Sequence, residues 1–132
     1  MRFTQDLSAG INLIRAYGNG ELRVNENVYR GAVILSASTL IAEANIHNLD
    51  ALVALDVSRT LALEPEMVLL GTGERQVFPP PAFGAQFLRA GIGFEVMDTS
   101  AACRTYNVLA GEQRAVVAML LLEETLEKIA GR

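Results

Sequence analysis

Apolar and polar residues alternate along the first part of the chain, a pattern typical of β-strands. Residues 12–17 and 21–24 both alternate, and the Gly-Asn-Gly between them, at 18–20, supplies residues that accept a positive φ. Two alternating runs on either side of such a turn predict an antiparallel β-hairpin.

A further turn at 25–27 precedes a run whose second half is continuously apolar. Residues 28–35 therefore predict one strand, which we place centrally in a sheet because its later side chains are apolar on both faces. The stretch 38–44 fits either a strand or a short helix, and we expect a strand.

The spacing of apolar residues becomes helical after residue 48. Asn48 or Asp50 can cap a short helix over 51–55. Pro65 then precedes the short apolar run 66–70, which predicts a buried strand ending at a sharp Gly-Thr-Gly turn.

Prolines, glycines and capping residues mark the elements that follow. A proline suited to the first turn opens a predicted helix over 81–91, and residues 93–98 predict the next strand. Thr99 or Ser100 caps a helix over about 101–110, where a glycine ends it.

The sequence predicts one more helix at the end of the chain, over 112–129. Its segment 115–122 is apolar on every face for two turns, so it has to be enclosed on all sides. Either the preceding helix and the hairpin enclose it, or a second subunit does, and we favour enclosure within the monomer.

The order strand, loop, helix, strand, helix over 66–111 indicates a βαβ unit with a right-handed crossover. We therefore expect an α/β fold with an N-terminal antiparallel hairpin joined to a mixed sheet that carries helices on its faces. The length of 132 residues, 51% of them apolar, suits a single domain over 1–132 with its own core.

Charge and special residues exclude several classes of function. The formal net charge of −4 argues against binding DNA or RNA, which needs a positive face. One cysteine and one histidine allow no internal disulfide and no Cys/His metal site, so we expect a reducing compartment and no metal. We also expect no cofactor.

We also expect no targeting segment. No apolar run follows the early charge at the N-terminus, so we expect no signal peptide. The longest apolar run, 115–122, is far shorter than the roughly 20 residues that span a bilayer. These features predict a cytoplasmic protein without membrane insertion.

The chain contains ten arginines and a single lysine. Codon bias in a GC-rich genome explains this ratio well enough. The alternative is a preference for planar, bidentate donors at a site or an interface.

The first candidate site is the turn after the buried strand. Glycines there let a backbone approach a phosphate closely. The third glycine of a dinucleotide-binding motif and the lysine of a P-loop are both absent, so a plain tight turn explains the motif as well. The candidate ligand-binding residues of this loop are Gly71, Thr72, Gly73 and Arg75.

The second candidate site is the start of the helix after the next strand. If the two strands are parallel neighbours, both loops reach the same sheet edge, where Arg75 and Arg104 could meet an anion. In the alternative interpretation, Asp98 and Thr99 only cap the helix and the arginine is a solvated surface charge. The candidates here are Asp98, Thr99, Ser100, Arg104 and Asn107.

Catalytic residues are hard to identify. Cys103 lies a turn inside its helix and reads as a small core residue, Ser100 has neither a nucleophile elbow nor a base, and His47 lies in an unrelated stretch. Glu95 lies between two apolar residues in a strand that we expect to be central, so it needs a partner if it is buried. Arg89, Arg104 and Arg114 are available, and we expect a structural ion pair, with Arg114 as the candidate partner, rather than a catalytic acid. An enzyme is therefore the less favoured interpretation.

The stretch 91–114 resembles a known family, and so does the Gly-Thr-Gly with its following prolines. Its most specific parts are Glu-Val-Met-Asp-Thr, Thr-Tyr-Asn-Val-Leu and the Glu-x-Arg at 112–114. The family is one of small α/β proteins of unknown function that includes mitochondrial respiratory complex I assembly factor 3 and the adipogenesis-associated domain protein. The resemblance implies a three-layer α/β fold, no established reaction, and a role in helping a membrane-bound respiratory complex assemble.

Two departures from that family's pattern stand out. Gln113 occupies the place of a more usual glycine, and residues 40–46 lack the expected aromatic side chain. We therefore expect a non-enzymatic interaction or assembly protein with a protein partner, in which a homodimer over the last helix is one arrangement. The alternative is a binder of a small anion or ligand, perhaps catalytic, that uses loops 71–76 and 98–107.

Overall fold

The computed structural model describes residues 10–122, and the first strands of this range form a small antiparallel sheet. Its order is β1-β2-β3, with β1 at Ile14–Gly18, β2 at Glu21–Val24 and β3 at Asn27–Tyr29. The predicted hairpin is confirmed. Asn19 and Gly20 both take positive φ (55° and 76°), as the two central residues of a tight hairpin turn require.

The predicted strand over 28–35 is wrong, because the chain breaks it at Gly31 to leave the small sheet. This glycine has φ +85°, and a Cβ on it would lie 2.6 Å from the Glu43 carbonyl oxygen. A sharp bend with close backbone contact is available only to glycine. The run therefore divides into β3 and β4 (Ala32–Leu35), which belong to different sheets.

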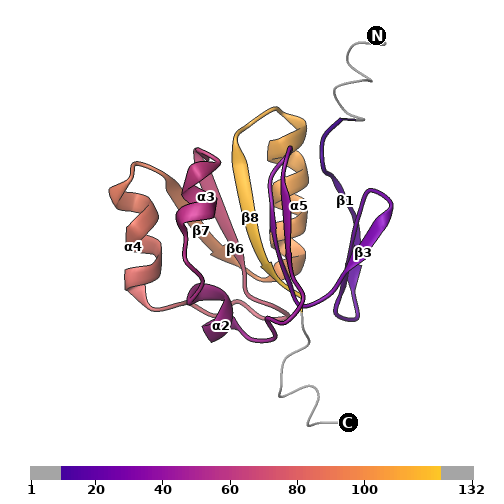
Figure 1. Cartoon of the computed structure of the whole chain (residues 1–132), viewed down its shortest axis with the longest axis horizontal. Helices are drawn as coiled ribbons and strands as arrows, with labels where there is room; N and C mark the ends of the chain where they lie inside the picture. Colours follow the sequence, from indigo (N-terminus) through magenta and orange to yellow (C-terminus); the bar gives the residue numbers. More distant parts are fainter. Residues whose placement is uncertain (1–9, 123–132) are drawn as a thin grey trace.

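A larger mixed sheet forms the centre of the molecule (Figure 1). Its order is β5-β4-β8-β6-β7, with β4 antiparallel to β5 and β8, and β6 parallel to β7 and β8. The strand that we expected in 38–44 is confirmed as β5. The remaining strands of this sheet are β5 (Leu40–Glu43), β6 (Met67–Gly71), β7 (Gly93–Met97) and β8 (Val116–Leu121).

The predicted last helix over 112–129 is wrong where the structure describes it. Residues 116–121 form β8, which lies between β4 and β6, and every one of them is buried. A strand covered on both faces is apolar at every position, just as a fully enclosed helix is. The prediction of enclosure within the monomer is correct, but β8 is enclosed as a strand, by the layers that pack on both faces of the sheet. Residues 123–129 lie outside the described range.

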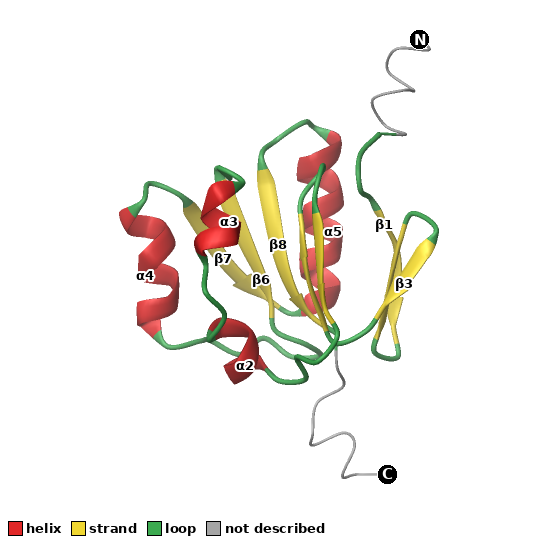
Figure 2. Ribbon diagram, viewed as in Figure 1, coloured by secondary structure: helices red, strands yellow, loops and turns green. Residues whose placement is uncertain are grey.

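Helices cover both faces of the large sheet (Figure 2). One face packs Val117, Met119 and Leu121 against a layer of three helices, and the other packs Val116, Ala118 and Leu120 against α5 and the small sheet. This is the α/β architecture that the sequence predicts. The helices are α2 (Leu49–Val53), α3 (Ser58–Ala62), α4 (Pro81–Arg89) and α5 (Thr99–Gly111).

The helices begin at the kinds of residue that the sequence analysis predicted, but one capping residue differs. Asn48 accepts from Ala51 N–H at 2.8 Å and caps α2, and Pro81 opens α4 as its first residue. The cap of α5 is Asp98 rather than Thr99 or Ser100, because its carboxylate accepts from Ala101 N–H. No helix within residues 10–122 is long and apolar enough to cross a membrane.

Candidate functional site

The loops that follow β6 and β7 meet at one edge of the large sheet, as the sequence predicts. Thr72 N–H donates to the Met97 carbonyl at 3.0 Å, and Thr99 N–H donates to the Gly73 carbonyl at 2.8 Å. The Gly-Thr-Gly turn and the start of α5 are therefore joined through their main chains.

Thr99 fastens this junction from the inside. It is fully buried, its hydroxyl donates to the Leu121 carbonyl at 2.6 Å, and the same oxygen accepts from Gly73 N–H at 2.8 Å. A Cβ on Gly71 would lie 3.0 Å from that oxygen, so glycine is what lets α5 begin this close to β6. Gly71, Gly73 and Thr99 thus hold α5 on the sheet.

Several backbone amides of the two loops donate to groups within the protein. Thr72 Oγ1 accepts from Val77 N–H at 3.1 Å and donates to the Arg75 carbonyl at 2.5 Å. The Asp98 carboxylate accepts from Ala101 N–H at 2.8 Å. These hydrogen bonds stabilise the turn and the start of the helix.

Three of the predicted site residues line a small cleft between α5 and β1. Ser100, Arg104 and Asn107 meet Arg15 and neighbouring β1 residues around a space of about 210 Å³. Arg104 Nη1 donates to Ser100 Oγ at 2.9 Å. These three side chains of α5 thus face β1.

Asn107 holds β1 against α5. Its Oδ1 accepts from Ile14 N–H at 2.9 Å, and its Nδ2 donates to the Ile14 carbonyl at 2.8 Å. A side-chain carboxamide that bonds both groups of one residue takes the place of a neighbouring strand for that residue. Its amide is therefore a structural clamp as well as part of the cleft wall.

Two ionisable groups at this cleft stay neutral at physiological pH. Burial raises the pKa of the Cys103 thiol to about 12 although Arg104 opposes the rise. Burial also raises the pKa of Tyr17 to about 12, aided by the nearby Cys103 and Glu74. A thiol with so high a pKa supplies almost no thiolate, the nucleophilic form, which agrees with the interpretation of Cys103 as a core residue.

The predicted ion pair between Glu95 and Arg114 is wrong. Arg114 Nη2 lies 2.6 Å from Glu66 Oε2, and Glu66 Oε1 accepts from Ala115 N–H at 3.2 Å. β7 is an edge strand and not a central one, so the Glu95 side chain is exposed and keeps its hydration. The hydrogen bond from Arg114 lowers the pKa of Glu66, helped by the bond from Ala115 N–H.

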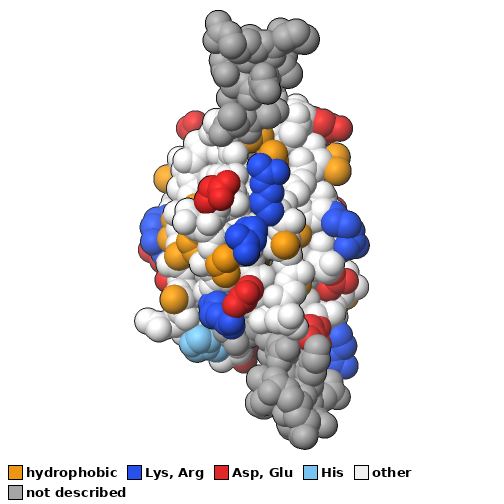
Figure 3. All heavy atoms as spheres, turned by 90° about the vertical axis from the view of Figure 1, so that its right-hand side faces the viewer, with side chains coloured by type: hydrophobic (Ala, Val, Ile, Leu, Met, Phe, Trp, Pro, Cys, Tyr) orange, Lys and Arg blue, Asp and Glu red, His pale blue; other side chains and the backbone are white. Residues whose placement is uncertain are grey.

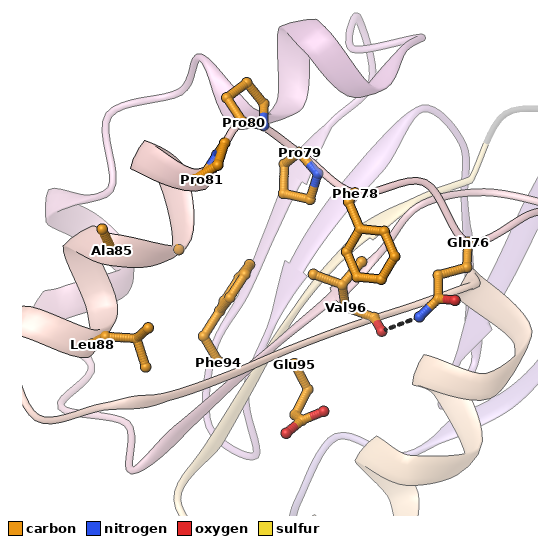
Figure 4. A pocket seen from close by; sticks show the side chains of 11 residues that line it. Gln76, Phe78, Pro79, Pro80, Pro81, Ala85, Leu88, Phe94, Glu95 and Val96 are labelled. Carbon is orange, nitrogen blue, oxygen red and sulfur yellow. Dashed lines mark hydrogen bonds between the residues drawn. The ribbon is translucent and has the colours of Figure 1, made fainter.

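A hollow larger than the cleft between α5 and β1 lies elsewhere, between the 74–80 loop, α4 and β7 (Figure 4). It has a volume of about 590 Å³ and is lined mainly by apolar groups. Phe78 is 72% exposed at its rim and Leu88 is 62% exposed on α4. We call this feature the β7 groove. Its lining residues are Gln76, Phe78–Pro81, Gly84, Ala85, Leu88 and Phe94–Val96.

Aromatic packing shapes the floor of the β7 groove. Phe94 stacks on Phe87 with ring centroids 5.6 Å apart, and Phe83 meets Phe94 edge to face at the same distance. A Cβ on Gly84 would lie 2.6 Å from Phe94 Cδ2, so this glycine lets the ring lie flat against α4. The floor is thus a fixed part of the core.

The sequence analysis did not find the β7 groove. Its lining comes from three separate segments, which only the fold brings together. One local signal was present: Val77 and Phe78 are large apolar residues in a proline-rich loop, where no strand or helix pattern buries them.

Metal ligands are not clustered in the described part of the chain. Among residues 10–122 no group of three or more His, Cys, Asp or Glu side chains could hold a metal ion. His47 is exposed on the loop before α2, away from the candidate site residues in sequence.

Known proteins resemble this chain over most of its length. The "13 kDa major membrane protein" of Francisella tularensis is 32% identical over 108 residues, which cover 81% of this chain and 88% of that protein. The NADH dehydrogenase (ubiquinone) 1 alpha subcomplex assembly factor 3 of Danio rerio is 29% identical over 118 residues, covering 89% and 67%. A crystal structure of a Bordetella parapertussis protein superposes with a TM-score of 0.78 at 34% identity, covering 86% of this chain and 98% of that one.

Residues 14–121 match a protein family described as "Protein of unknown function (DUF498/DUF598)". This range includes every described strand and both loops of the candidate site. The family relationship that the sequence suggested is therefore confirmed: the chain belongs to the DUF498/DUF598 family of proteins of unknown function.

Proposed function

We propose that this protein is a non-enzymatic interaction protein that helps a respiratory membrane complex to assemble, and that it binds its partner at the β7 groove. The observation that carries the proposal is the apolar lining of the groove together with the exposed Phe78 and Leu88 at its margin. Large apolar side chains gathered at a hollow are typical of protein-binding surfaces.

The kind of partner is suggested by the Danio rerio relative, which is named as an assembly factor of NADH dehydrogenase. A subunit waiting for assembly exposes apolar surface that its neighbours will later cover. Covering one Phe or Leu side chain completely contributes about 1.5–3 kcal/mol, so Phe78 and Leu88 together can supply a large share of a transient contact.

Capture from native lysate tests this proposal. Tagged wild-type protein should recover subunits of a respiratory membrane complex, and Leu88→Glu should lose them because it places a charge at the apolar groove. Val108→Glu is the matched control, since Val108 is equally exposed (58%) on a different helix, α5. If the wild type recovers no such subunits, or if Leu88→Glu recovers them as well as Val108→Glu does, the proposal fails.

Anion binding is a second candidate, favoured by the cleft between α5 and β1. Arg104 and Arg15 both line that cleft, beside Ser100 and Asn107, and guanidinium groups bind phosphates and carboxylates bidentately. The surface over the small sheet also carries several Arg side chains, with Asp and Glu side chains between them (Figure 3). Loop 71–76 joins the cleft region through the contacts of Gly73 with Thr99.

A thermal-shift series tests the second candidate. Inorganic phosphate, nucleotides and small carboxylates at millimolar concentration should raise the melting temperature of the wild type but not of Arg104→Gln, because a ligand of the folded state stabilises it. No shift with any of them contradicts anion binding. The cytoplasmic location, the homodimer and the lack of nucleic-acid binding expected from the sequence remain predictions.

A further inference from the structure

The strand β7 has one edge that no strand of the described chain covers. It is the last strand in the order β5-β4-β8-β6-β7. Gly93 N–H donates to the Glu66 carbonyl and the Met97 carbonyl accepts from Thr72 N–H, so residues 93 and 97 turn their main chain toward β6. Because this direction alternates along a strand, Phe94 and Val96 turn their main-chain groups outward.

A side chain already occupies part of this outer edge. Gln76 Nε2 donates to the Val96 carbonyl at 2.9 Å (Figure 4). A carboxamide carries the same donor and acceptor as a peptide bond, so Gln76 takes the position of one peptide group of an added strand. Because Gln76 is exposed, a peptide group of an added strand can displace its side chain.

The β7 groove runs beside this same edge. Phe94 and Val96 direct their side chains to the α4 face, where they join the core cluster of Phe83 and Phe87. A strand paired with β7 would place the side chains opposite Phe94 and Val96 on that face too. Two apolar residues separated by one other residue therefore fit into the groove.

Glu95 decides which kind of strand fits. Its exposed side chain points away from Phe94 in Figure 4. If β7 of a second copy paired antiparallel about its middle, the two Glu95 carboxylates would lie directly opposite each other, and like charges in that position are destabilising. A Lys or Arg in the same position makes a favourable cross-strand pair.

We infer that the β7 groove binds an extended segment of a partner protein, which adds to the large sheet as a strand antiparallel to β7. The segment carries an apolar residue, a Lys or Arg, and a second apolar residue in succession. The apolar pair enters the groove, the basic residue faces Glu95, and the outer groups of Phe94 and Val96 bond its main chain. This inference rests on the proposed partner binding at the groove and specifies how it occurs.

Peptide titrations followed by NMR test the inference. The ¹⁵N-labelled full chain is titrated with Thr-Ser-Val-Lys-Val-Ser-Thr and with the same peptide N-methylated at both valines. The first should shift the amide signals of Phe94 and Val96 and the side-chain amide of Gln76. The methylated peptide should shift none of them, because it lacks the two N–H donors that face the edge of β7.

The charge requirement is tested with a third peptide that has Glu in place of Lys. It should bind roughly two- to fivefold more weakly, the effect of one cross-strand charge pair, and Glu95→Lys should reverse this preference. Equal shifts with the methylated peptide, or no shifts at millimolar peptide, overturn the inference. Concentration-dependent shifts of the same amides in the free protein would identify a second copy as the occupant and overturn it as well.

The two proposals can fail separately. If the lysate capture depends on Leu88 while no peptide shifts the amides of Phe94 and Val96, the groove binds its partner by side chains alone and only the strand addition is wrong. If the peptide binds as expected and no respiratory subunit is captured, the strand addition stands and the assembly role is wrong.

Discussion

At the scale of single residues, Gln113 has a backbone conformation that favours glycine. It has φ +63°, a conformation that costs an L-residue roughly 1–2 kcal/mol and glycine almost nothing. The family resemblance also favours glycine at this position. The expected strain explains the preference: the turn between α5 and β8 needs a left-handed residue.

Replacing Gln113 by glycine should therefore stabilise the fold. We expect a gain of about 0.5–1 kcal/mol, because relief of the positive φ exceeds the added entropy of the unfolded chain. Chemical denaturation measures the change. Glu112→Gly is the matched control: Glu112 has an ordinary φ of −90°, so glycine there should only destabilise. A Gln113→Gly variant no more stable than the wild type would contradict the argument.

The ion pair of Glu66 with Arg114 gives a second residue-scale prediction, this one about pH. The pKa of Glu66 is lowered chiefly by the hydrogen bond from Arg114. A carboxyl whose pKa is lower in the folded chain stabilises the fold above its ordinary pKa of about 4.3, and this contribution disappears as the pH falls through the lowered value.

The measurement is an NMR titration of the Glu66 carboxyl. In Arg114→Gln its pKa should rise toward the ordinary value, whereas Arg30→Gln, which removes an arginine paired with Glu21 in the small sheet, should leave it unchanged. A pKa that stays low in Arg114→Gln would show that Ala115 N–H and not the guanidinium sets it.

At the scale of elements, local signals predict some parts of this fold well and others not at all. The hairpin, β6, α4, β7 and α5 follow from turn residues, caps and short apolar runs, since each of these acts within a few residues. β8 does not, because an apolar run of six residues fits a central strand and a buried helix equally. Its neighbours β4 and β6 decide the matter, and they are distant in sequence.

The candidate site divides in the same way. The meeting of the two loops follows from a parallel pair of strands, and the sequence predicts it. Thr99 and Thr72 accept hydrogen bonds from amides of the first loop. These bonds depend on the exact positions of the two hydroxyl groups, which the spacing of residues in a sequence does not contain. The β7 groove lies between three segments and has no continuous sequence pattern.

Asn107 gives the prediction at this scale, because one side chain attaches a whole element. Asn107→Ala removes both hydrogen bonds between α5 and Ile14 in β1. Leaving these backbone groups without partners should cost about 1–3 kcal/mol and should speed hydrogen exchange across β1. Val108→Ala, on an exposed position of the same helix, is the control. Unchanged exchange in β1 would show that these two hydrogen bonds do not hold β1 against α5.

At the scale of the whole molecule, the edges of the large sheet decide what it can associate with. An uncovered strand edge beside an apolar groove invites pairing with another copy, and proteins commonly prevent this with a charged residue in the edge strand. Glu95 occupies the middle of β7 and is exposed. The same carboxylate that selects a basic partner segment therefore keeps two copies apart.

Glu95→Val should remove that barrier and create a dimer. Two valine-bearing β7 strands can pair antiparallel about residue 95 with favourable cross-strand contacts, joining two five-stranded sheets edge to edge. Sedimentation velocity at two protein concentrations should show for this variant an additional concentration-dependent association that the wild type lacks. Glu112→Val, which exposes the same side chain beyond the end of α5, controls for nonspecific apolar association. Only pairing through β7 depends on where the charge is lost. If both variants dimerise alike, or if neither does, Glu95 is therefore not what prevents pairing at this edge.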